Sequence, residues 1–444
     1  MEQPPQHRRW YLGPILVMTL LIGVLVGKGW ERTGYATETY EELKTFSEVL
    51  TQIQRHYVED VNVKELVLGA VRGMLSTLDP HSAYMTPDMY KEMQVETRGE
   101  FGGIGIQIGV KDNRLTVIAP IEETPAHRAG IQAGDYIAKV NDEATKDMTI
   151  MEAVRRMRGP KGTKVSLTIE RKGTPDPIVF TLVRDIIKIE SVRSKIIDGN
   201  IVYIRITQFQ ESTARDLRQA LKEFRDREHP SMILDLRNNP GGLLSAAVEV
   251  SEQFIPPGKL IVYTQGREGR KDEYVSHPKH DYEEFPMIVL VNEGSASASE
   301  IVAGAVQDWG KAIIVGANTF GKGSVQTILP LTDGSGLRLT TAKYYTPKGR
   351  SIQSTGITPD ILVKAQPASV TKPGSSGSSA SASQSSISPG GASSSPRSGD
   401  KAPPNTTGGL GVSSGLGTLE DDPQLQKAVE LLKTWKIFKE LRPL

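Results

Sequence analysis

The sequence predicts an α/β protein: a mixed sheet with flanking helices, a smaller inserted β-rich module, and helical segments at both ends. The core prediction rests on residues 187–363, where short apolar stretches alternate with amphipathic stretches of helical periodicity. Residues 99–182 differ, because they contain short β-branched runs separated by glycine turns. Residues 37–90 carry apolar side chains at three- and four-residue steps, which is typical of helices.

The composition excludes several classes of function. The chain has 444 residues, room for about two to four domains, and a formal net charge of +1 without a long basic run. We therefore expect no nucleic-acid partner. There is no cysteine, which excludes disulfides, thiolate nucleophiles and thiolate metal sites. The sequence contains no H-E-x-x-H motif and no cluster of His and Asp at ligand spacing, so we expect neither a metal nor another cofactor.

The N-terminus predicts a membrane anchor. After Arg8 and Arg9, the 18 residues Trp10–Gly27 carry no charge, and Lys28 ends the stretch. At about 1.5 Å per residue, such a helix is about 27 Å long, close to the apolar thickness of a bilayer. No clear A-x-A cleavage site follows, so residues 1–33 are interpreted as a short cytoplasmic tail and an uncleaved signal anchor. This predicts a single-pass protein of a bacterial cell membrane with its catalytic part outside; a cleaved signal peptide, and hence secretion, is the alternative.

The remaining segments follow in chain order. A helical region is expected at 37–96, interrupted by the turn-forming sequence LDPHSAYMTPD. The β-rich module is expected at 97–182 and the α/β core at 183–365. Residues 366–418 are dominated by Ser, Gly, Pro and Ala, which predicts a disordered linker. The last segment, 419–444, has an acidic start and the pattern of an amphipathic helix.

The pentapeptide SASAS occurs twice, and its surroundings distinguish the two copies. Ser379–Ser383 lies in the linker, where no strand or helix could hold a catalytic serine, and the same applies to the G-x-S-x-G match at Gly411–Gly415. Ser295–Ser299 instead follows an apolar strand and precedes a helix. A serine in such a turn can present its hydroxyl beside the free amides of the helix N-terminus, where an oxyanion would be stabilised. On this stretch alone, Ser295 or Ser299 could equally be a helix N-cap.

A serine nucleophile needs a base, and Lys322 is the candidate. None of the seven histidines stands at a strand end in a setting typical of a catalytic triad. Lys322 follows an apolar strand and Phe320, with glycines on both sides. A lysine acts as a base near neutral pH when burial lowers its pKa from about 10.4 by about 2 to 3 units. The stretch Asn318–Pro330 contains no acid, and Gln326 could bind the amine without adding negative charge; a surface lysine in a glycine turn is the alternative.

The core closely resembles the carboxyl-terminal processing (tail-specific) proteases, on four motifs in the expected order: DLRNNPGG, GSASASE, FGKGSVQ and YYTPKGRSIQSTGITPD. The resemblance implies a serine endopeptidase with a serine–lysine dyad on a core similar to those of crotonases and the Clp protease. By motif position it implies Ser297 as the nucleophile, Lys322 as the general base and Gln326 as the residue that orients the lysine. It also implies an oxyanion hole made by the backbone amides of Ala298 and of Gly242, in preference to the glycine before it.

The β-rich module resembles a PDZ domain of the bacterial, circularly permuted kind, on the sequences GEFGGIGIQIGV and TPAHRAGIQAGDYIAKVND. Gly103, Ile104 and Gly105 would present open backbone amides to the terminal carboxylate of a peptide, and the following strand would pair with that peptide. Residues 149–157 would form the other wall and select proteins or peptides with apolar C-termini. A simple hairpin is the alternative for these glycines.

The resemblance has two further implications, for regulation and for assembly. Arg158 matches a position that resembles a ligand sensor in some relatives, which implies a gating role, although Arg155 and Arg156 offer the same chemistry. The N-terminal helical region and the last helix resemble the parts that form dimer contacts in relatives, which implies a homodimer. The linker of about 50 residues departs from the pattern, and leaves open whether the last helix packs on its own core, reaches a partner or hangs free.

The expected function is therefore a serine endopeptidase that recognises the C-terminal tails of its substrates through a PDZ domain and cleaves them outside the cytoplasmic membrane. The alternative is a PDZ scaffold that binds tails without cutting them. The joint presence of Ser297, Lys322 and Gln326 favours the protease, because a scaffold would be free to lose any of them.

Overall fold

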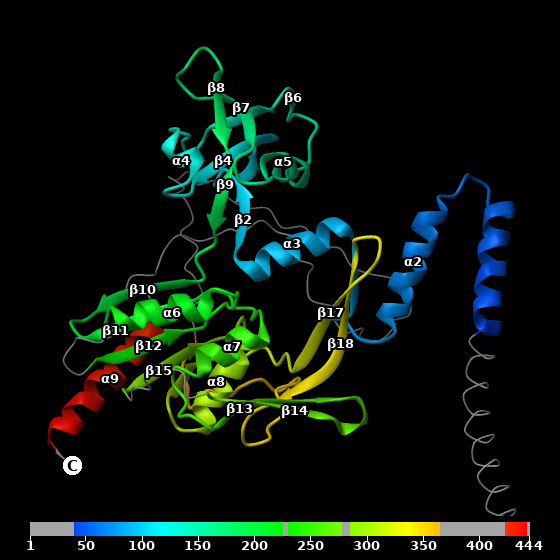
Figure 1. The fold of residues 1–444 in the computed structure, drawn as a ribbon. Helices are drawn as coiled ribbons and strands as arrows, with labels where there is room; N and C mark the ends of the chain where they lie inside the picture. Colours follow the sequence, from blue (N-terminus) through cyan, green and yellow to red (C-terminus); the bar gives the residue numbers. More distant parts are fainter. Residues whose placement is uncertain (1–39, 225–229, 278–284, 365–421, 442–444) are drawn as a thin grey trace, which may run out of the picture. The chain divides into compact units, whose positions relative to one another are not determined.

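The structure, a computed structural model, describes four stretches of the chain (Figure 1): residues 40–224, 230–277, 285–364 and 422–441. The chain divides into two compact units, Met1–Asp79 and Pro80–Leu444. Within the first unit the structure describes a helix at 40–56 and the helix α2 (Val63–Ser76). These helices expose many apolar side chains: Tyr40, Leu43, Phe46, Val49, Val63, Val67 and Met74.

The predicted membrane location is wrong for the part of the chain that the structure describes. Its helices have 19 residues or fewer and carry charged side chains, and none is long and apolar enough to cross a bilayer. The stretch on which the prediction rested, Trp10–Gly27, lies outside the described residues. The assignment to a cell membrane is therefore withdrawn.

The predicted linker at 366–418 and the second SASAS copy also lie outside the described residues.

The second unit begins with β1 (Ala83–Met85) and α3 (Pro87–Arg98). α3 begins with a proline in its first turn, where a missing amide costs no hydrogen bond, and ends at Gly99 in the left-handed conformation, with φ +76°. A Cβ at Gly99 would lie 2.4 Å from Gln210 Oε1. A larger residue here would be strained by the left-handed backbone and would have to displace the Gln210 side chain.

The β-rich module is an antiparallel sheet with two helices and its own apolar core. Its strands pair in the order β3-β4-β5-β7-β8, and β6 pairs with β5. The bounds are β3 Ile106–Lys111, β4 Arg114–Pro120, β5 Tyr136–Val140, β6 Glu143–Ala144, β7 Lys164–Glu170, β8 Ile178–Val183, α4 Pro125–Arg128 and α5 Ile150–Met157. A two-stranded ribbon of β2 (Glu100–Gly103) and β9 (Asp185–Lys188) connects the module to the core.

The α/β core is built on a six-stranded sheet with the order β10-β11-β12-β15-β16-β19. β10 is antiparallel to β11, and the other pairs are parallel. The bounds are β10 Val192–Ile197, β11 Ile201–Ile206, β12 Ser231–Asp235, β15 Met287–Val291, β16 Ile313–Gly316 and β19 Ile361–Leu362. Because parallel strands end at the same edge of a sheet, the loops after β12, β15 and β16 meet there.

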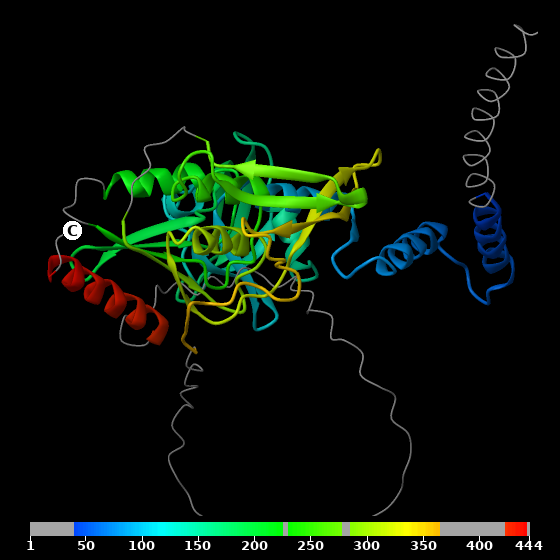
Figure 2. The same ribbon diagram turned by 90° about the horizontal axis from the view of Figure 1, so that it is seen from below.

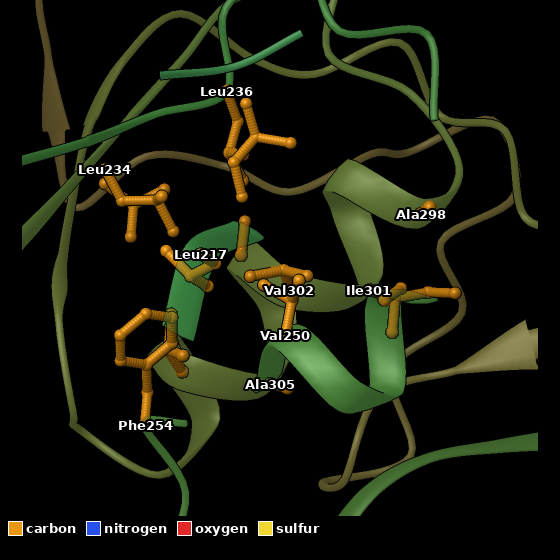
Figure 3. Close-up of a cluster of buried hydrophobic side chains, with 14 of the residues drawn as sticks. Leu217, Leu234, Leu236, Val250, Phe254, Ala298, Ile301, Val302 and Ala305 are labelled. Carbon is orange, nitrogen blue, oxygen red and sulfur yellow. The ribbon is translucent and has the colours of Figure 1, made fainter. Parts of the chain in front are cut away.

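Three helices cover one face of this sheet: α6 Thr213–Lys222, α7 Leu244–Ser251 and α8 Ala298–Asp308. Their apolar side chains form the largest buried cluster, which includes Leu217, Val250 and Ile301 together with Leu234 of β12; Figure 3 shows Leu217 beside Leu234. This burial holds α8, which begins at Ala298 within the SASAS stretch, against the sheet.

The last helix, α9 (Pro423–Leu441), covers the opposite face of the sheet from α6, as Figure 2 shows. Successive residues of β12 alternate between the two faces, with Leu234 in the cluster of α6 to α8 and Ile233 in the cluster of α9. The sheet is therefore buried on both sides, which is typical of a parallel sheet.

The predicted fold class, an α/β core with an inserted β-rich module and helical segments before and after it, is confirmed.

A second, antiparallel sheet borders the core, with the order β1-β18-β13-β14 and β17 paired to β18. The bounds are β13 Leu260–Gly266, β14 Lys271–Val275, β17 Ser324–Pro330 and β18 Gly336–Tyr345, and the short helix η2 (Arg267–Gly269) lies between β13 and β14. β17 directly follows the loop that carries Lys322, and the pairing places β18 beside it.

Candidate active site

The first and last serines of the SASAS turn hold backbone groups. Ser295 Oγ donates a hydrogen bond to the Leu236 carbonyl at 2.8 Å, and Ser299 Oγ donates to the Asn239 carbonyl at 2.9 Å. Both side chains are fully buried. Their hydroxyls therefore fasten the turn to the loop after β12, and only the middle serine is left for chemistry.

Ser297, the middle serine, has an unusual backbone conformation. Its φ is +55° and its ψ is −111°, a combination that residues other than glycine rarely adopt. Strain of this kind costs about 1–3 kcal/mol and persists only where the surrounding structure holds it. The Ser297 side chain contacts the buried phenol of Tyr344, and burial raises the pKa of that phenol to about 12.

Lys322 lies in the loop between β16 and β17, and its Nζ donates to Gln326 Oε1 at 3.3 Å. Burial and, to a lesser extent, the charge of Arg338 lower the pKa of Lys322 from its ordinary 10.5, against a weaker opposing effect of Glu300. A lowered pKa is what a lysine base requires. Across the described stretches no hydrogen bond joins the side chains of Ser297 and Lys322, and the buried Gln326 Nε2 has no hydrogen-bond partner there.

One buried carboxylate, that of Glu300, joins the serine turn to the lysine loop. Its Oε1 accepts hydrogen bonds from Thr319 Oγ1 at 2.5 Å and from the Gly321 amide at 2.7 Å. Its Oε2 accepts from the Ser297 amide at 2.7 Å and from the Lys322 amide at 2.9 Å. Burial raises the pKa of Glu300, and these hydrogen bonds oppose the rise. The sequence alone did not indicate this role, because a glutamate three residues after a serine is ordinary at a helix start.

The loop after β12, residues 237–242, is called the NPGG loop here. Gly241 has φ +104°, and a Cβ at this position would lie 3.0 Å from the Ala298 amide nitrogen. The Gly241 amide already donates to Asn239 Oδ1 at 2.9 Å. The amides of Gly242 and Ala298, in contrast, donate to no other residue in the described ranges. This pattern leaves the two amides that sequence analysis assigned to an oxyanion hole available for a ligand.

The predicted peptide-binding residues lie where the ribbon meets the β-rich module. Gly103 ends β2, and Ile104 and Gly105 lie between β2 and β3. The carbonyls of Ile104 and Gly105 accept hydrogen bonds from α4 and from the loop before it, whereas their amides bond to nothing else that the structure describes. A Cβ at Gly105, where φ is +78°, would lie 2.3 Å from Thr124 Cβ. β3 follows at the edge of its sheet and is therefore open to pairing.

Arg158 is anchored on α3. Its guanidinium forms an ion pair with Glu92, with Nη2 3.0 Å from Oε1, and lies 4.3 Å from the centre of the Phe101 ring. Arg155 and Arg156 pair with other carboxylates. The structure thus brings Arg158 to the helix that leads into the β2–β9 ribbon, and not to the loop that carries Lys322.

Several neighbours of the candidate dyad escaped the sequence analysis. Arg338 and Tyr344 lie on β18, and only the pairing of β17 with β18 brings that strand next to Lys322. Asn239 is fully buried, and its side chain joins the Ile206 carbonyl to the Gly241 amide. In the part of the chain that the structure describes, no group of three or more His, Asp or Glu side chains could hold a metal ion.

Replacing Glu300 by glutamine should destabilise the protein, because an amide has only one acceptor oxygen. Its NH₂ group must face either the Ser297 and Lys322 amides or the Gly321 amide and the Thr319 hydroxyl, and backbone amides cannot accept a hydrogen bond from it. One or two buried amides left without an acceptor cost about 1–5 kcal/mol in the free energy of unfolding, which urea unfolding would measure. Glu293→Gln, at an exposed position before the same turn, is the matched control and should change stability by less than about 0.5 kcal/mol. Equal stability of the two variants would contradict the role of Glu300.

Three family models match the chain: the activating protease CtpB N-terminal domain over residues 28–89, the PDZ domain over 92–170 and peptidase family S41 over 200–363. The chain is 45% identical over 337 residues to a carboxy-terminal-processing protease of Bartonella bacilliformis, covering 75% of this chain and 77% of the relative. It is 36% identical over 374 residues to a carboxyl-terminal-processing protease of Synechocystis, covering 79% and 87%. A solved structure, of a photosystem II D1 C-terminal processing protease, is 29% identical with a TM-score of 0.43, covering 72% of this chain and 92% of that one.

The matched segments fall on the parts described above: the N-terminal helices, the β-rich module and the α/β core. Both curated relatives bear the same name and are covered over more than three quarters of their length. These matches confirm the family and the enzyme class expected from the motifs. The chain belongs to the carboxyl-terminal processing proteases, serine peptidases of family S41 that carry a PDZ domain.

Proposed function

We propose that this protein is an endopeptidase with a Ser297–Lys322 dyad, which chooses protein substrates by their C-terminal tails. One observation carries the dyad: the carboxylate of Glu300 binds the backbone amides of both residues. The strained serine and the buried lysine are thereby held by the same group, while burial lowers the pKa of the lysine.

In the proposed reaction, neutral Lys322 takes the proton of Ser297 Oγ as that oxygen attacks the substrate carbonyl carbon. The amides of Gly242 and Ala298 stabilise the negative oxygen of the tetrahedral intermediate. The C–N bond breaks, the leaving amine receives the proton from the Lys322 ammonium, and an acyl-enzyme remains. Water then attacks this ester with Lys322 again as base, releasing the acid and restoring the serine. Gln326 orients the amine throughout, through its hydrogen bond to Nζ.

Tail recognition is proposed for the open edge of β3, beside α5. The available amides of Ile104 and Gly105 suit a terminal carboxylate, and the open edge of β3 suits an added strand. Ile150 and Met151 of α5 are 40% and 60% exposed, and offer apolar contacts to the last side chains of a tail. These features support a preference for apolar C-termini.

A gating role for Arg158 is supported by a series of contacts that runs from its partner on α3 to the NPGG loop. Arg158 holds Glu92 on α3, and α3 ends at Gly99, which lies against the Gln210 side chain. The residue before Gln210, Phe209, exchanges backbone hydrogen bonds with the NPGG loop and the residue after it, at 2.9 and 2.8 Å. A tail that moves Arg158 would thus shift the segment at Phe209 and Gln210, which contacts the loop of the proposed oxyanion hole.

A homodimer remains a prediction, supported by the exposed apolar side chains of the helix at 40–56.

A second candidate function is a tail-binding scaffold without proteolysis. It is favoured by one observation: in the described residues Ser297 contacts Tyr344, and no hydrogen bond joins its side chain to Lys322. In proteases, the catalytic hydrogen bond to the base often forms only with substrate present.

Cleavage assays with wild type, Ser297→Ala and Lys322→Ala distinguish them. The substrate is an unfolded protein that ends either in apolar residues or, as a matched control, in acidic ones. We expect cleavage by wild type only, about tenfold faster with the apolar tail, because each variant removes one partner of the proton transfer. Tail binding by all three proteins without cleavage by any would favour the scaffold, and cleavage by Ser297→Ala would contradict the assigned nucleophile.

The rate of cleavage should depend on pH through Lys322. kcat/KM should rise with pH as the lysine loses its proton, with a midpoint below 10.5, because burial and Arg338 lower its pKa. Arg338→Gln removes a positive charge that disfavours the ammonium, so the pKa of Lys322 should rise and the profile should move to higher pH. Arg270→Gln, at an exposed site on the β13–β14 hairpin, is the control and should leave the midpoint unchanged. A shift to lower pH in Arg338→Gln would refute this account.

Arg158→Ala should uncouple binding from turnover. We expect the Kd of a fluorescent apolar tail peptide to stay within about twofold of wild type, because Arg158 contacts Glu92 and Phe101 rather than the proposed carboxylate site. kcat should fall by about tenfold or more. Arg156→Ala serves as the control, because Arg156 pairs with Glu143 of β6 and not with α3. Equal losses of binding and turnover in Arg158→Ala would count against gating.

A further inference from the structure

The C-terminal helix is an integral part of the core. Four apolar side chains of α9, Leu425, Ala428, Val429 and Leu432, are at most 4% exposed. They pack with Tyr203 and other apolar residues of the core strands, on the face opposite α6 (Figure 2). The helix therefore stays with its own core in the structure, although residues 366–418 separate the two in the chain.

The first residues of this helical segment bind Arg237. Asp422 Oδ1 accepts a hydrogen bond from Arg237 Nη1 at 2.8 Å, and Asp422 Oδ2 lies 2.7 Å from Nη2. Gln424 Oε1 accepts from Nη1 at 3.1 Å, and Gln424 Nε2 donates to the Val363 carbonyl at 2.8 Å. Asp422 also caps the helix, because its Oδ1 accepts from the Leu425 amide at 3.0 Å.

Arg237 is the first residue of the NPGG loop, which contributes Gly242 to the proposed oxyanion hole. After it, the Asn238 amide donates to Asn292 Oδ1 at 2.8 Å, and the Asn239 carbonyl accepts from the Ala296 amide at 3.0 Å. The loop is thus fastened to the serine turn on one side and, through its first side chain, to α9 on the other. A shift of Arg237 would pull on the segment that ends at Gly242.

Arg237 pairs with two carboxylates, and Asp235 alone could not take over the contacts that Asp422 makes. The fully buried Asp235 carboxylate already accepts from the Tyr203 hydroxyl at 2.6 Å and from the Arg237 amide at 2.9 Å, as well as from the Arg237 guanidinium. Burial acts to raise the pKa of Asp422, but the hydrogen bonds and charge of Arg237 outweigh it and lower that pKa. Asp422 therefore remains charged at neutral pH and holds the outer side of the guanidinium.

We propose that Asp422 is a positioning residue for catalysis: by holding Arg237, it fixes the NPGG loop in the geometry that an oxyanion hole requires. This inference rests on the proposed dyad reaction. It makes the last helix a requirement for turnover, beyond its contribution to stability. Asp422 touches no substrate and acts only through Arg237.

The test compares steady-state kinetics of full-length wild type, Asp422→Asn and Lys433→Ala on a protein with an apolar tail. Asparagine keeps the helix cap but removes the charge that holds Arg237. Lys433 pairs with Asp198 at another point of the same helix, so Lys433→Ala weakens docking without touching Arg237. We expect Asp422→Asn to lower kcat about tenfold with KM within about twofold, and Lys433→Ala to leave both unchanged.

Thermal unfolding of each variant separates positioning from general loss of stability. We expect both variants to remain folded at the assay temperature with similar midpoints. If Asp422→Asn does not fold, Gln424→Ala provides the same comparison, because it removes the other acceptor of Arg237 Nη1 from this helix; a smaller drop in kcat is expected. Rates for Ser297→Ala supply the baseline for uncatalysed cleavage.

Two results would overturn the inference while leaving the proposed function intact. One is a kcat in Asp422→Asn, or in Gln424→Ala where that variant replaces it, equal to that of wild type. The other is an equal loss of kcat in Lys433→Ala, which would mean that loosening the helix anywhere has the same effect. A wild-type chain that does not cleave above the Ser297→Ala baseline would overturn the proposed function itself, and this inference with it.

Discussion

The proposed site depends on one buried carboxylate. Glu300 stands in the first turn of α8, yet its two oxygens bind donors from both the serine turn and the lysine loop. Those two segments follow different strands of the parallel sheet, and nothing in the sheet itself fixes their separation to a fraction of an ångström. A shared carboxylate does, because moving either segment leaves buried donors without an acceptor. The strained backbone of Ser297 persists because its amide is one of those donors.

This arrangement carries an electrostatic conflict. A base lysine works best away from negative charge, and Glu300 raises the pKa of Lys322. The conflict is limited in two ways. Glu300 binds the Lys322 amide and not its Nζ, which instead meets the uncharged Gln326. Burial and the charge of Arg338 then outweigh the remaining attraction, so that the net effect is a lowered pKa. The second sheet, which carries Arg338, therefore contributes charge as well as shape.

The two faces of the core sheet serve the site differently. On one face, α8 and its neighbours bury the apolar cluster that holds the serine turn (Figure 3). On the other face, α9 reaches Arg237 at the start of the NPGG loop. Both contacts depend on the same property of a parallel sheet, in which several strands end at one edge. Helices on both faces of the sheet can therefore contact the loops at that edge.

The sequence by itself determined the fold class, the family and the identity of the serine turn, because each depends on local pattern: alternation of apolar stretches, motif order, and a strand and helix around SASAS. It could also tell the first SASAS copy from the second. The membrane location predicted from the sequence was wrong for the described residues. That prediction rested on one uncharged stretch, and no helix that the structure describes is long and apolar enough to cross a bilayer. Only tertiary structure decided the surroundings of Lys322. The stretch Asn318–Pro330 has no acid, yet folding brings Glu300 to it, and strand pairing adds Arg338. Asp422 likewise meets Arg237 only after a chain separation of 185 residues is closed by packing, a contact that no local pattern encodes.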